Sequence, residues 1–228
     1  MIIAIDGPAG SGKSSTARAV AGRLGFLHLD SGALYRGFAL VAARRGWTRE
    51  DGSVPESMIE GLARQAVDAR VVGRGLQVMV DGAAVPDGEL RTADVTAAAS
   101  KVSAHRPIRL RVNEILRRLA SDHSGHIVCE GRDMGTVVFP DASLKVWMEA
   151  GAEERARRRL RQLGRATTPR SLREQKDRLE ARDTADSRRS ESPLRRAADA
   201  VVIDTTDLSF EEQVQRIVDE ARHRLDMP

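Results

Sequence analysis

The stretch GPAGSGKS, residues 7–14, matches the pattern G-x-x-x-x-G-K-[ST] at every fixed position. The apolar run IIAID at 2–6 precedes it and indicates a buried strand, and residues 13–24 carry apolar or small side chains at helical spacing. A strand, a glycine-rich turn and a helix in this order form a phosphate-binding loop, because backbone N–H groups and the helix N-terminus face an anion. The stretch therefore predicts an α/β chain that binds a nucleoside triphosphate with Mg²⁺.

Two side chains of this loop have chemistry of their own. Lys13 is expected to reach the β- and γ-phosphates, and the hydroxyl of Ser14 can ligate Mg²⁺. We expect the whole stretch to contact ATP, namely Gly7, Pro8, Ala9, Gly10, Ser11, Gly12, Lys13, Ser14 and Ser15.

Composition limits the classes of protein that fit. The chain has 228 residues, of which 41% are hydrophobic and 31% are charged, so it can bury a sizeable core. No apolar run approaches the roughly 18 residues needed to span a bilayer, and the start MIIAIDG lacks the features of a signal peptide. Cys129 is the single cysteine, which excludes an intrachain disulfide and suits a small buried hydrophobe. We expect a cytoplasmic protein with no membrane partner.

The positive charge of the chain comes almost entirely from arginine. The net charge is +4, with 33 Arg against 4 Lys, a skew that genome composition alone could also produce. The planar fork of arginine pairs with phosphate oxygens. Only 3% of the residues are aromatic, too few to stack the bases of a single strand. The balance favours small phosphorylated ligands and argues against a nucleic-acid partner.

Strands and helices alternate along most of the chain. Predicted strands lie at 2–6, 27–29, 126–130, 144–148 and 200–204, and predicted helices at 13–24, 32–46, 56–67, 92–104, 107–121 and 209–225. This alternation predicts a parallel sheet covered by helices on both faces. Residues 68–86 differ, because three short β-rich runs are split there by Gly-Arg-Gly and Asp-Gly, which predicts a small antiparallel sheet.

Residues 153–196, here called the arginine-rich segment, also stand apart. They hold 14 Arg and one Lys, interleaved with acids, and few large apolar residues follow Leu163. The segment is either a solvated helical face or a mobile lid that closes over an anionic ligand. Within it Arg182, Asp186 and Arg189 fall at i, i+4 and i+7, which predicts one stripe of a helix.

Three classes of nucleotide-using protein compete at this point. A GTPase would read guanine through Asn-Lys-x-Asp, but Asn113 is the only asparagine and is followed by Glu. A motor or helicase-like ATPase would need surfaces for nucleic acid, which the aromatic content disfavours. A small-molecule kinase needs an acceptor site and a lid. The pair Arg132 and Asp133, directly after the strand at 126–130, and the arginine-rich segment are candidates for these parts.

Four stretches in order, GPAGSGKS at 7–14, DSGALYRG at 30–37, EGRDMGTVVFPDA at 130–142 and RDTADSRRSESPL at 182–194, together resemble bacterial cytidylate kinases, a family of P-loop nucleoside monophosphate kinases. The order and spacing hold from residue 2 to about residue 225. The resemblance implies a three-layer P-loop kinase fold in one domain, 1–228. An acceptor-binding region would occupy 31–110 and include the β insertion 68–86, and a helical lid would occupy 153–190.

The resemblance also implies an activity, the transfer of the γ-phosphoryl group of ATP to CMP or dCMP with Mg²⁺. The alternative is a kinase of another small metabolite, such as shikimate or gluconate, on the same fold, which would lack residues that read cytosine. A binding protein that hydrolyses ATP slowly is a more distant alternative. We expect a monomer whose ligands are ATP and CMP or dCMP.

Several residues take roles from this resemblance on the acceptor side. Ser31, Tyr35 and Arg36 would lie by the acceptor, with Arg36 on its phosphate, although Tyr35 could equally be a packing aromatic. Ser100 and Arg109 would read the cytosine edge.

The remaining roles fall after the strand at 126–130. Asp133 would read cytosine together with Arg109, since an acidic acceptor and an arginine donor complement the base edge. Arg132 would contact the phosphate, and the stripe of the arginine-rich segment would clamp the nucleotide, partly through its ribose. The catalytic set is Lys13, Arg132, Arg182 and Arg189, and Asp186 completes the clamp. Glu130 stands where such proteins often place an acidic partner of Mg²⁺ or water, and whether it holds the metal through water stays open.

Overall fold

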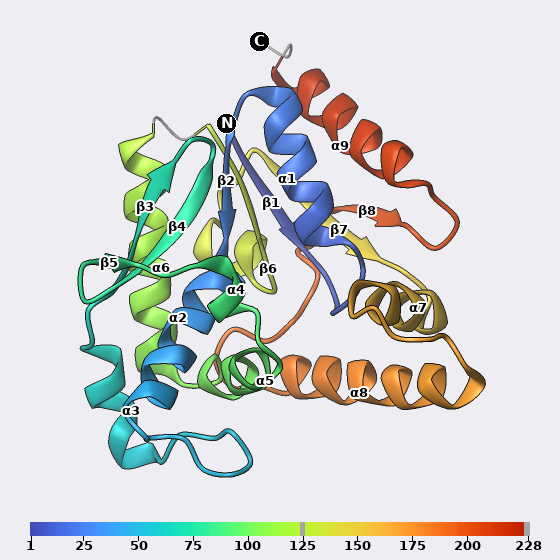
Figure 1. The fold of residues 1–228 in the computed structure, drawn as a ribbon. Coiled ribbons are helices and arrows are strands. Elements are labelled where there is room, and N and C mark those ends of the chain that lie inside the picture. The colour runs from blue at the N-terminus through green and yellow to red at the C-terminus, as the bar shows by residue number, and fades with distance from the viewer. Residues whose placement is uncertain (124–125, 226–228) are drawn as a thin grey trace. The chain divides into compact units, whose positions relative to one another are not determined.

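The apolar runs that predict strands pair into one five-stranded sheet with the order β2-β6-β1-β7-β8 (Figure 1). Its strands are β1 (Ile2–Asp6), β2 (Leu27–Asp30), β6 (Ile127–Gly131), β7 (Leu144–Glu149) and β8 (Val201–Asp204). β1 pairs in parallel with β6 and β7, and β7 pairs in parallel with β8. This confirms the predicted central parallel sheet. The phosphate loop leaves from its middle strand.

The computed structural model describes residues 1–123 and 126–225, and the chain divides into two compact units. The first unit comprises Met1–His28 and His126–Pro228, and the second comprises Leu29–Gly125. The central sheet belongs to the first unit, apart from the end of β2. The predicted acceptor region, 31–110, falls within the second unit. No helix of the described ranges is long and apolar enough to cross a membrane.

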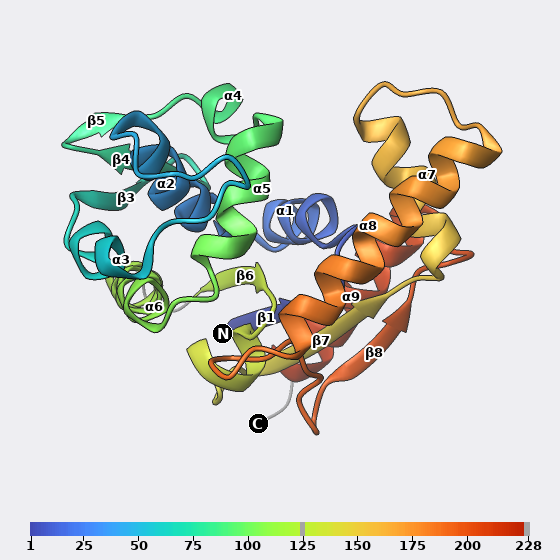
Figure 2. The same cartoon turned by 90° about the horizontal axis from the view of Figure 1, so that it is seen from below.

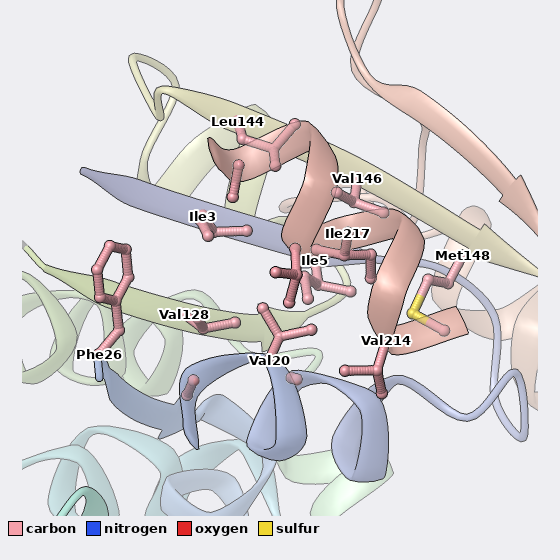
Figure 3. Close-up of a cluster of buried hydrophobic side chains, with 14 of the residues drawn as sticks. Ile3, Ile5, Val20, Phe26, Val128, Leu144, Val146, Met148, Val214 and Ile217 are labelled. Carbon is pink, nitrogen blue, oxygen red and sulfur yellow. The ribbon is translucent and has the colours of Figure 1, made fainter. Parts of the chain in front are cut away.

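A buried apolar cluster joins one face of the central sheet to the helices α1 (Lys13–Leu24) and α9 (Phe210–Leu225). Alternate residues of β1 and β7 point to this face, as the two-residue period of a strand requires. Figure 3 shows Ile3 and Ile5 of β1 facing Val20 of α1 and Ile217 of α9. Each such side chain contributes about 1.5–3 kcal/mol when fully buried. Cys129 in β6 is buried as well, as the sequence predicts.

The arginine-rich segment forms two helices, α7 (Ala152–Gln162) and α8 (Pro169–Ser187), which lie side by side (Figure 2). A reciprocal capping box at Thr168 starts α8. The helix ends before Arg189, so the prediction that Arg182, Asp186 and Arg189 form one helical stripe is wrong in its last member. The backbone reason is that the carbonyl of Asp186 accepts from the N–H of Leu194 at 2.9 Å, as the chain turns back.

The second unit contains the predicted antiparallel sheet, with the strands β3 (Val67–Val72), β4 (Gly75–Val80) and β5 (Ala83–Ala84). Asp81 and Gly82 both have positive φ, 49° and 78°, which suits the tight turn expected at Asp-Gly. The helices are α2 (Ser31–Arg44), α3 (Glu56–Ala63), α4 (Asp87–Leu90), α5 (Ala93–Val102) and α6 (Arg106–Asp122). The helix expected at 56–67 therefore ends early, because Val67 already pairs with Val80. The short α4 was not predicted.

Candidate active site

The phosphate loop leaves β1 in backbone conformations that favour glycine. Gly7 has a φ of 148°, and a Cβ atom at this position would lie 2.0 Å from the carbonyl oxygen of Met148. Gly12, with a φ of 93°, is the N-cap of α1, and in the described chain no side chain caps this helix end. The N–H groups of the first turn are thus left for an anion, and the helix dipole adds positive potential. This is the chemistry predicted for residues 7–15.

Lys13 is buried within the loop that it is predicted to serve. Its Nζ donates to the carbonyl oxygen of Pro8 at 2.6 Å and to Oγ of Ser11 at 3.2 Å. Burial holds the pKa of Lys13 well below its usual value, and the charge of Arg132 lowers the pKa further, whereas Glu130 acts in the opposite direction. A phosphate next to the ammonium group would favour its charged form. The local field therefore favours an anion beside Lys13.

Asp6, at the end of β1, fixes the turn that follows Asp133. Its carboxylate accepts from the backbone N–H of Met134 at 2.8 Å and from that of Gly135 at 2.7 Å. The turn is a short π-helix, η1 (Met134–Val138), which the sequence did not predict. Burial raises the pKa of Asp6 to about 6, although its two backbone hydrogen bonds oppose the rise.

Asp6 was not among the residues predicted for the site. The signal that could have found it is an acid at the end of a buried strand, directly before the phosphate loop. Asp133, which Asp6 helps to position through the turn, is itself only 1% exposed.

The oxygen donors near the phosphate loop fit Mg²⁺. Ser14 is exposed in the first turn of α1, and Glu130 is buried in β6, with its Oε1 4.0 Å from Nε2 of His28. The described residues include no cluster of three His, Cys, Asp or Glu that could hold a metal by themselves. Mg²⁺ in nucleotide sites needs no such cluster, because it keeps several waters and takes phosphate oxygens. One hydroxyl and one carboxylate are therefore a compatible set.

Asp186 forms ion pairs with two of the arginines that were predicted to bind the nucleotide. Its side chain is 1% exposed, its Oδ2 accepts from Nε of Arg132 at 2.9 Å, and its Oδ1 pairs with Arg189. Arg182, one turn earlier on α8, has a buried Nε with no hydrogen-bond partner among the described residues. The pKa of Arg182 is lowered to about 10, chiefly by burial and also by the charge of Arg132, although Asp186 and Asp183 oppose the fall. Arg132 and Arg189 share the single carboxylate of Asp186, and Arg182 lies beside them, which leaves positive charge for a phosphorylated ligand.

In the second unit, Asp30 orients the arginine that is predicted to hold the acceptor phosphate. Its carboxylate caps α2 by accepting from the N–H of Ala33 at 3.1 Å, and it accepts from Arg36 at 2.8 Å and from Arg91 at 3.4 Å. Ser31, the first residue of α2, is buried beside this cap. Asp30 stands in the motif DSGALYRG, but no role was predicted for it from the sequence.

Tyr35 and Arg109 lie against each other in the same unit. Cζ of Arg109 is 5.5 Å from the centroid of the Tyr35 ring, within the range of a cation–π interaction. Arg109 also donates to the carbonyl oxygen of Ser103 at 2.8 Å. Ser100 lies one turn before Ser103, and its carbonyl accepts from Oγ of Ser103 at 2.9 Å. Tyr35 thus has a packing contact with a predicted ligand residue.

The predicted site residues fall into two groups, one in each unit. The loop residues 7–15, Glu130, Arg132, Asp133, Arg182, Asp186 and Arg189 belong to the first unit, and Ser31, Tyr35, Arg36, Ser100 and Arg109 belong to the second. A hollow of about 490 Å³ lies elsewhere in the first unit, over β8 and α9, and none of these residues lines it. The phosphate loop and the arginines around Asp186 are therefore the better candidates for chemistry.

Comparisons with known proteins identify the family of the chain. A family model described as cytidylate kinase matches residues 3–223. The cytidylate kinase of Salinibacter ruber is 42% identical over 226 residues, which cover 97% of each chain. That of Desulfitobacterium hafniense is 43% identical over 216 residues, which cover 95% of this chain and 90% of the relative.

Solved structures show the same fold at lower identity. TT1252 from Thermus thermophilus has a TM-score of 0.51 at 22% identity and covers 100% of this chain and 98% of its own. An uncharacterized protein from Eubacterium ventriosum has a TM-score of 0.52 at 12% identity, with 97% of this chain and 98% of that chain covered. These two likenesses support the fold alone, whereas the family model and the close relatives agree over nearly the whole chain. The chain therefore belongs to the cytidylate kinase family.

Proposed function

We propose that the protein transfers the γ-phosphoryl group of ATP to CMP or dCMP, producing ADP and CDP or dCDP. The observation that carries the proposal is an excess of cations in the first unit. Arg132 and Arg189 both pair with the carboxylate of Asp186, and Arg182 lies one turn earlier on α8. Lys13 is buried in the phosphate loop of the same unit. Gathering like charges with partial burial is unfavourable unless anions join them. Two phosphates that exchange a phosphoryl group supply such anions.

ATP binds on residues 7–15, with its β- and γ-phosphates at Lys13. Backbone N–H groups of the loop and the free end of α1 hold the phosphate oxygens. Mg²⁺, when bound, neutralises phosphate charge and orients the donor. Ser14 supplies a hydroxyl ligand for the metal, and Glu130 supplies a carboxylate that acts through water.

CMP binds through its base, its phosphate and its ribose. Asp133, Arg109 and Ser100 read the cytosine edge. Arg36 and Arg132 hold the phosphate, and each is oriented by a carboxylate at 2.8–2.9 Å, Asp30 for the first and Asp186 for the second. Ser31 and Tyr35, both on α2, lie beside the bound CMP.

The ribose and the transferring group contact the C-terminal part of α8 and the residues that follow it. Both oxygens of Asp186 already pair with arginines, but each carboxylate oxygen has a second lone pair that can accept from a ribose hydroxyl. Arg182, with its Nε lacking a partner in the described chain, donates to ligand oxygens. Arg189 completes this clamp.

In the transfer step an oxygen of the CMP phosphate attacks the γ-phosphorus, and the bond from that phosphorus to the β,γ-bridging oxygen breaks, so that ADP leaves. Lys13, Arg132, Arg182 and Arg189 stabilise the charge on the transferring group. The segment 153–190 acts as a lid that excludes water, which prevents hydrolysis of ATP. One chain supplies every role, and the enzyme acts as a monomer.

A coupled assay of ADP release tests the proposal directly. ATP and Mg²⁺ are supplied with CMP, dCMP, UMP, AMP, GMP, shikimate or gluconate in separate reactions. We expect CMP and dCMP to give the highest kcat/KM, because only cytosine presents the N4 donor and the N3 and O2 acceptors that the predicted residues complement. A higher kcat/KM for shikimate or gluconate than for CMP would refute the assignment. Sedimentation at several protein concentrations tests the monomer.

A further inference from the structure

A second carboxylate on α8, that of Asp183, reaches the phosphate loop. Its Oδ1 accepts from the backbone N–H of Ala9 at 2.8 Å, and its Oδ2 pairs with Arg155 of α7. The guanidinium group of Arg155 also donates to the carbonyl oxygen of Ala9 at 2.9 Å. Both backbone polar groups of Ala9 are therefore bound by side chains 146 and 174 residues further along the chain. We call Asp183, Arg155 and the backbone of Ala9 the loop clip.

The loop clip is closely packed. Ala9 lies in an apolar cluster with Ala156 of α7 and Leu179 of α8, and all three are buried. A Cβ atom at Gly10 would lie 3.1 Å from the carbonyl oxygen of Arg155, so the backbone of the loop lies directly against α7. Figure 2 shows the two helices side by side. The loop and both helices therefore share one packed contact within the first unit.

The loop clip differs from the ordinary ion pairs of the arginine-rich segment. Arg157 pairs with Glu153, and Arg170 with Glu174, four residues apart on one helix and with mostly exposed side chains. Such pairs contribute little to stability. The side chains of Arg155 and Asp183 are only 9% and 15% exposed and join two helices. They also satisfy backbone groups that would otherwise be buried without partners.

The position of Asp183 connects this contact to the chemistry. Asp183 follows Arg182 directly and precedes Asp186 by three residues, so the three side chains leave one turn of α8. The hydrogen bond between Asp183 and Ala9 fixes the position of that turn along the helix axis and its rotation about the axis, both relative to the phosphate loop. We propose that Asp183 and Arg155 are positioning residues for phosphoryl transfer, which hold Arg182 and Asp186 at a fixed distance from the phosphate loop. This inference rests on the proposed function for the roles of Arg182 and Asp186.

The loop clip makes a prediction about ATP alone. ATP restricts the phosphate loop, and a restricted loop presents the N–H and C=O of Ala9 in one place for Asp183 and Arg155. A ligand on the loop and the docking of α8 therefore favour each other, and this coupling is reciprocal. An ATP analogue without acceptor should slow hydrogen exchange along α8, and should do so only while the loop clip is intact.

The test uses the full chain with Asp183→Asn, which keeps the size of the side chain but places an N–H₂ group against Arg155. Asp177→Asn is the matched control, because Asp177 is exposed on the same helix. Hydrogen exchange of residues 7–15 and 169–187 is measured with and without a non-hydrolysable ATP analogue, and kcat is measured with CMP.

We expect the analogue to protect both segments in the wild type and in Asp177→Asn. In Asp183→Asn it should protect the loop while protection of α8 falls by about tenfold or more, and kcat should fall by about 10–100-fold through misplacement of reacting groups. Unchanged α8 protection in Asp183→Asn, or a kcat within twofold of Asp177→Asn, would overturn the inference.

Two further results keep the test decisive. If Asp183→Asn does not fold, as judged by circular dichroism, Arg155→Lys is used for the same measurements, because lysine keeps the charge but cannot bind Ala9 and Asp183 with one fork. If the wild type phosphorylates neither CMP nor dCMP, the proposed function fails. The exchange of α8 with the analogue alone then still decides whether the loop clip couples the helix to the loop.

Discussion

Replacing Lys13 with methionine separates the charge of the phosphate loop from its packing. Methionine keeps most of the apolar stem and removes the ammonium group. The change deletes the two hydrogen bonds that Nζ donates to Pro8 and Ser11. It also removes a buried cation whose pKa is lowered by burial and by the charge of Arg132.

These effects oppose each other in the free energy of unfolding. Two lost hydrogen bonds cost about 1–3 kcal/mol, and relief from desolvation and from like charge offsets a similar amount. We expect the melting temperature to change by less than about 5 °C, because 1 kcal/mol corresponds to about 2–4 °C in a protein of this size. No opposing effect compensates the loss in kcat, because the ammonium group stabilises negative charge on the phosphoryl group that is being transferred. Its loss should lower kcat by about 10²–10³-fold.

The coupled assay with ATP and CMP measures the rate, and thermal unfolding followed by circular dichroism measures stability. Lys176→Met is the matched control, because Lys176 is an exposed lysine on α8, and it should leave both quantities unchanged. A kcat within fivefold of wild type would refute the role of Lys13 in transfer. A melting temperature lowered by more than about 10 °C would show instead that the ammonium holds the loop together.

Three other substitutions test separate parts of the site. Asp133→Ala should weaken Kd for CMP by about 5–150-fold, the equivalent of 1–3 kcal/mol for an unpaired base donor, with little change for an ATP analogue; equal losses in calorimetry would mean that Asp133 supports the fold. Arg189→Ala should lower kcat by about 10²-fold with a nearly unchanged melting temperature, because Asp186 keeps its hydrogen bond to Arg132; a large drop in melting temperature would contradict this. Asp6 has a folded pKa raised from 3.8 to about 6, so its contribution to stability is fully present below pH 3.8 and is lost as pH rises through 6. Relative to Asp6→Asn, the wild type should lose about 2–3 kcal/mol of unfolding free energy between pH 4 and pH 7, and an equal pH dependence in urea titrations of both proteins would exclude this role.

Local sequence patterns predicted most helices and strands. The errors lie where contacts with residues distant in the sequence determine where an element ends or which turn forms. The turn at Asp81 and Gly82 was predictable, because its conformation depends on those two residues. The helix expected at 56–67 ends at Ala63, because Val67 pairs with Val80 in a hairpin that helical spacing cannot reveal. The π-helical turn η1 was not predictable, because the carboxylate that holds it lies 128 residues away in Asp6.

The same distinction applies to the candidate site. The phosphate loop is a contiguous motif, so its residues and their chemistry could be identified together. The acceptor residues were named through the resemblance, since no local pattern connects Arg109 with Tyr35. Asp30, Asp183 and Arg155 were assigned no role, because a side chain that orients another residue is recognised only when both ends of the contact are known. For Asp183 one end is Ala9, which is 174 residues away.

The arginine-rich segment was expected to be either a solvated helical face or a lid over an anion. In the structure it contains two kinds of charged contact, exposed ion pairs within one helix and buried contacts with other elements. Arg157 and Arg170 pair with acids four residues away and are exposed, as a solvated face requires. Asp183 and Asp186, three residues apart on α8, instead bind groups on other elements, Ala9 in the first case and Arg132 in the second.

The count of charges cannot separate the two kinds of pair, but the sequence distance to the partner can. A pair within one turn forms on any exposed helix, because the helix already holds both residues in place. A buried pair between distant residues forms only where the fold fixes both groups and compensates their desolvation. Asp186 and Arg132 are 54 residues apart, and Asp183 and Arg155 are 28 apart. A charged helix therefore points to function through these long-range buried pairs, and substitutions in the turn of α8 that carries two of them should lower both the rate and the stability.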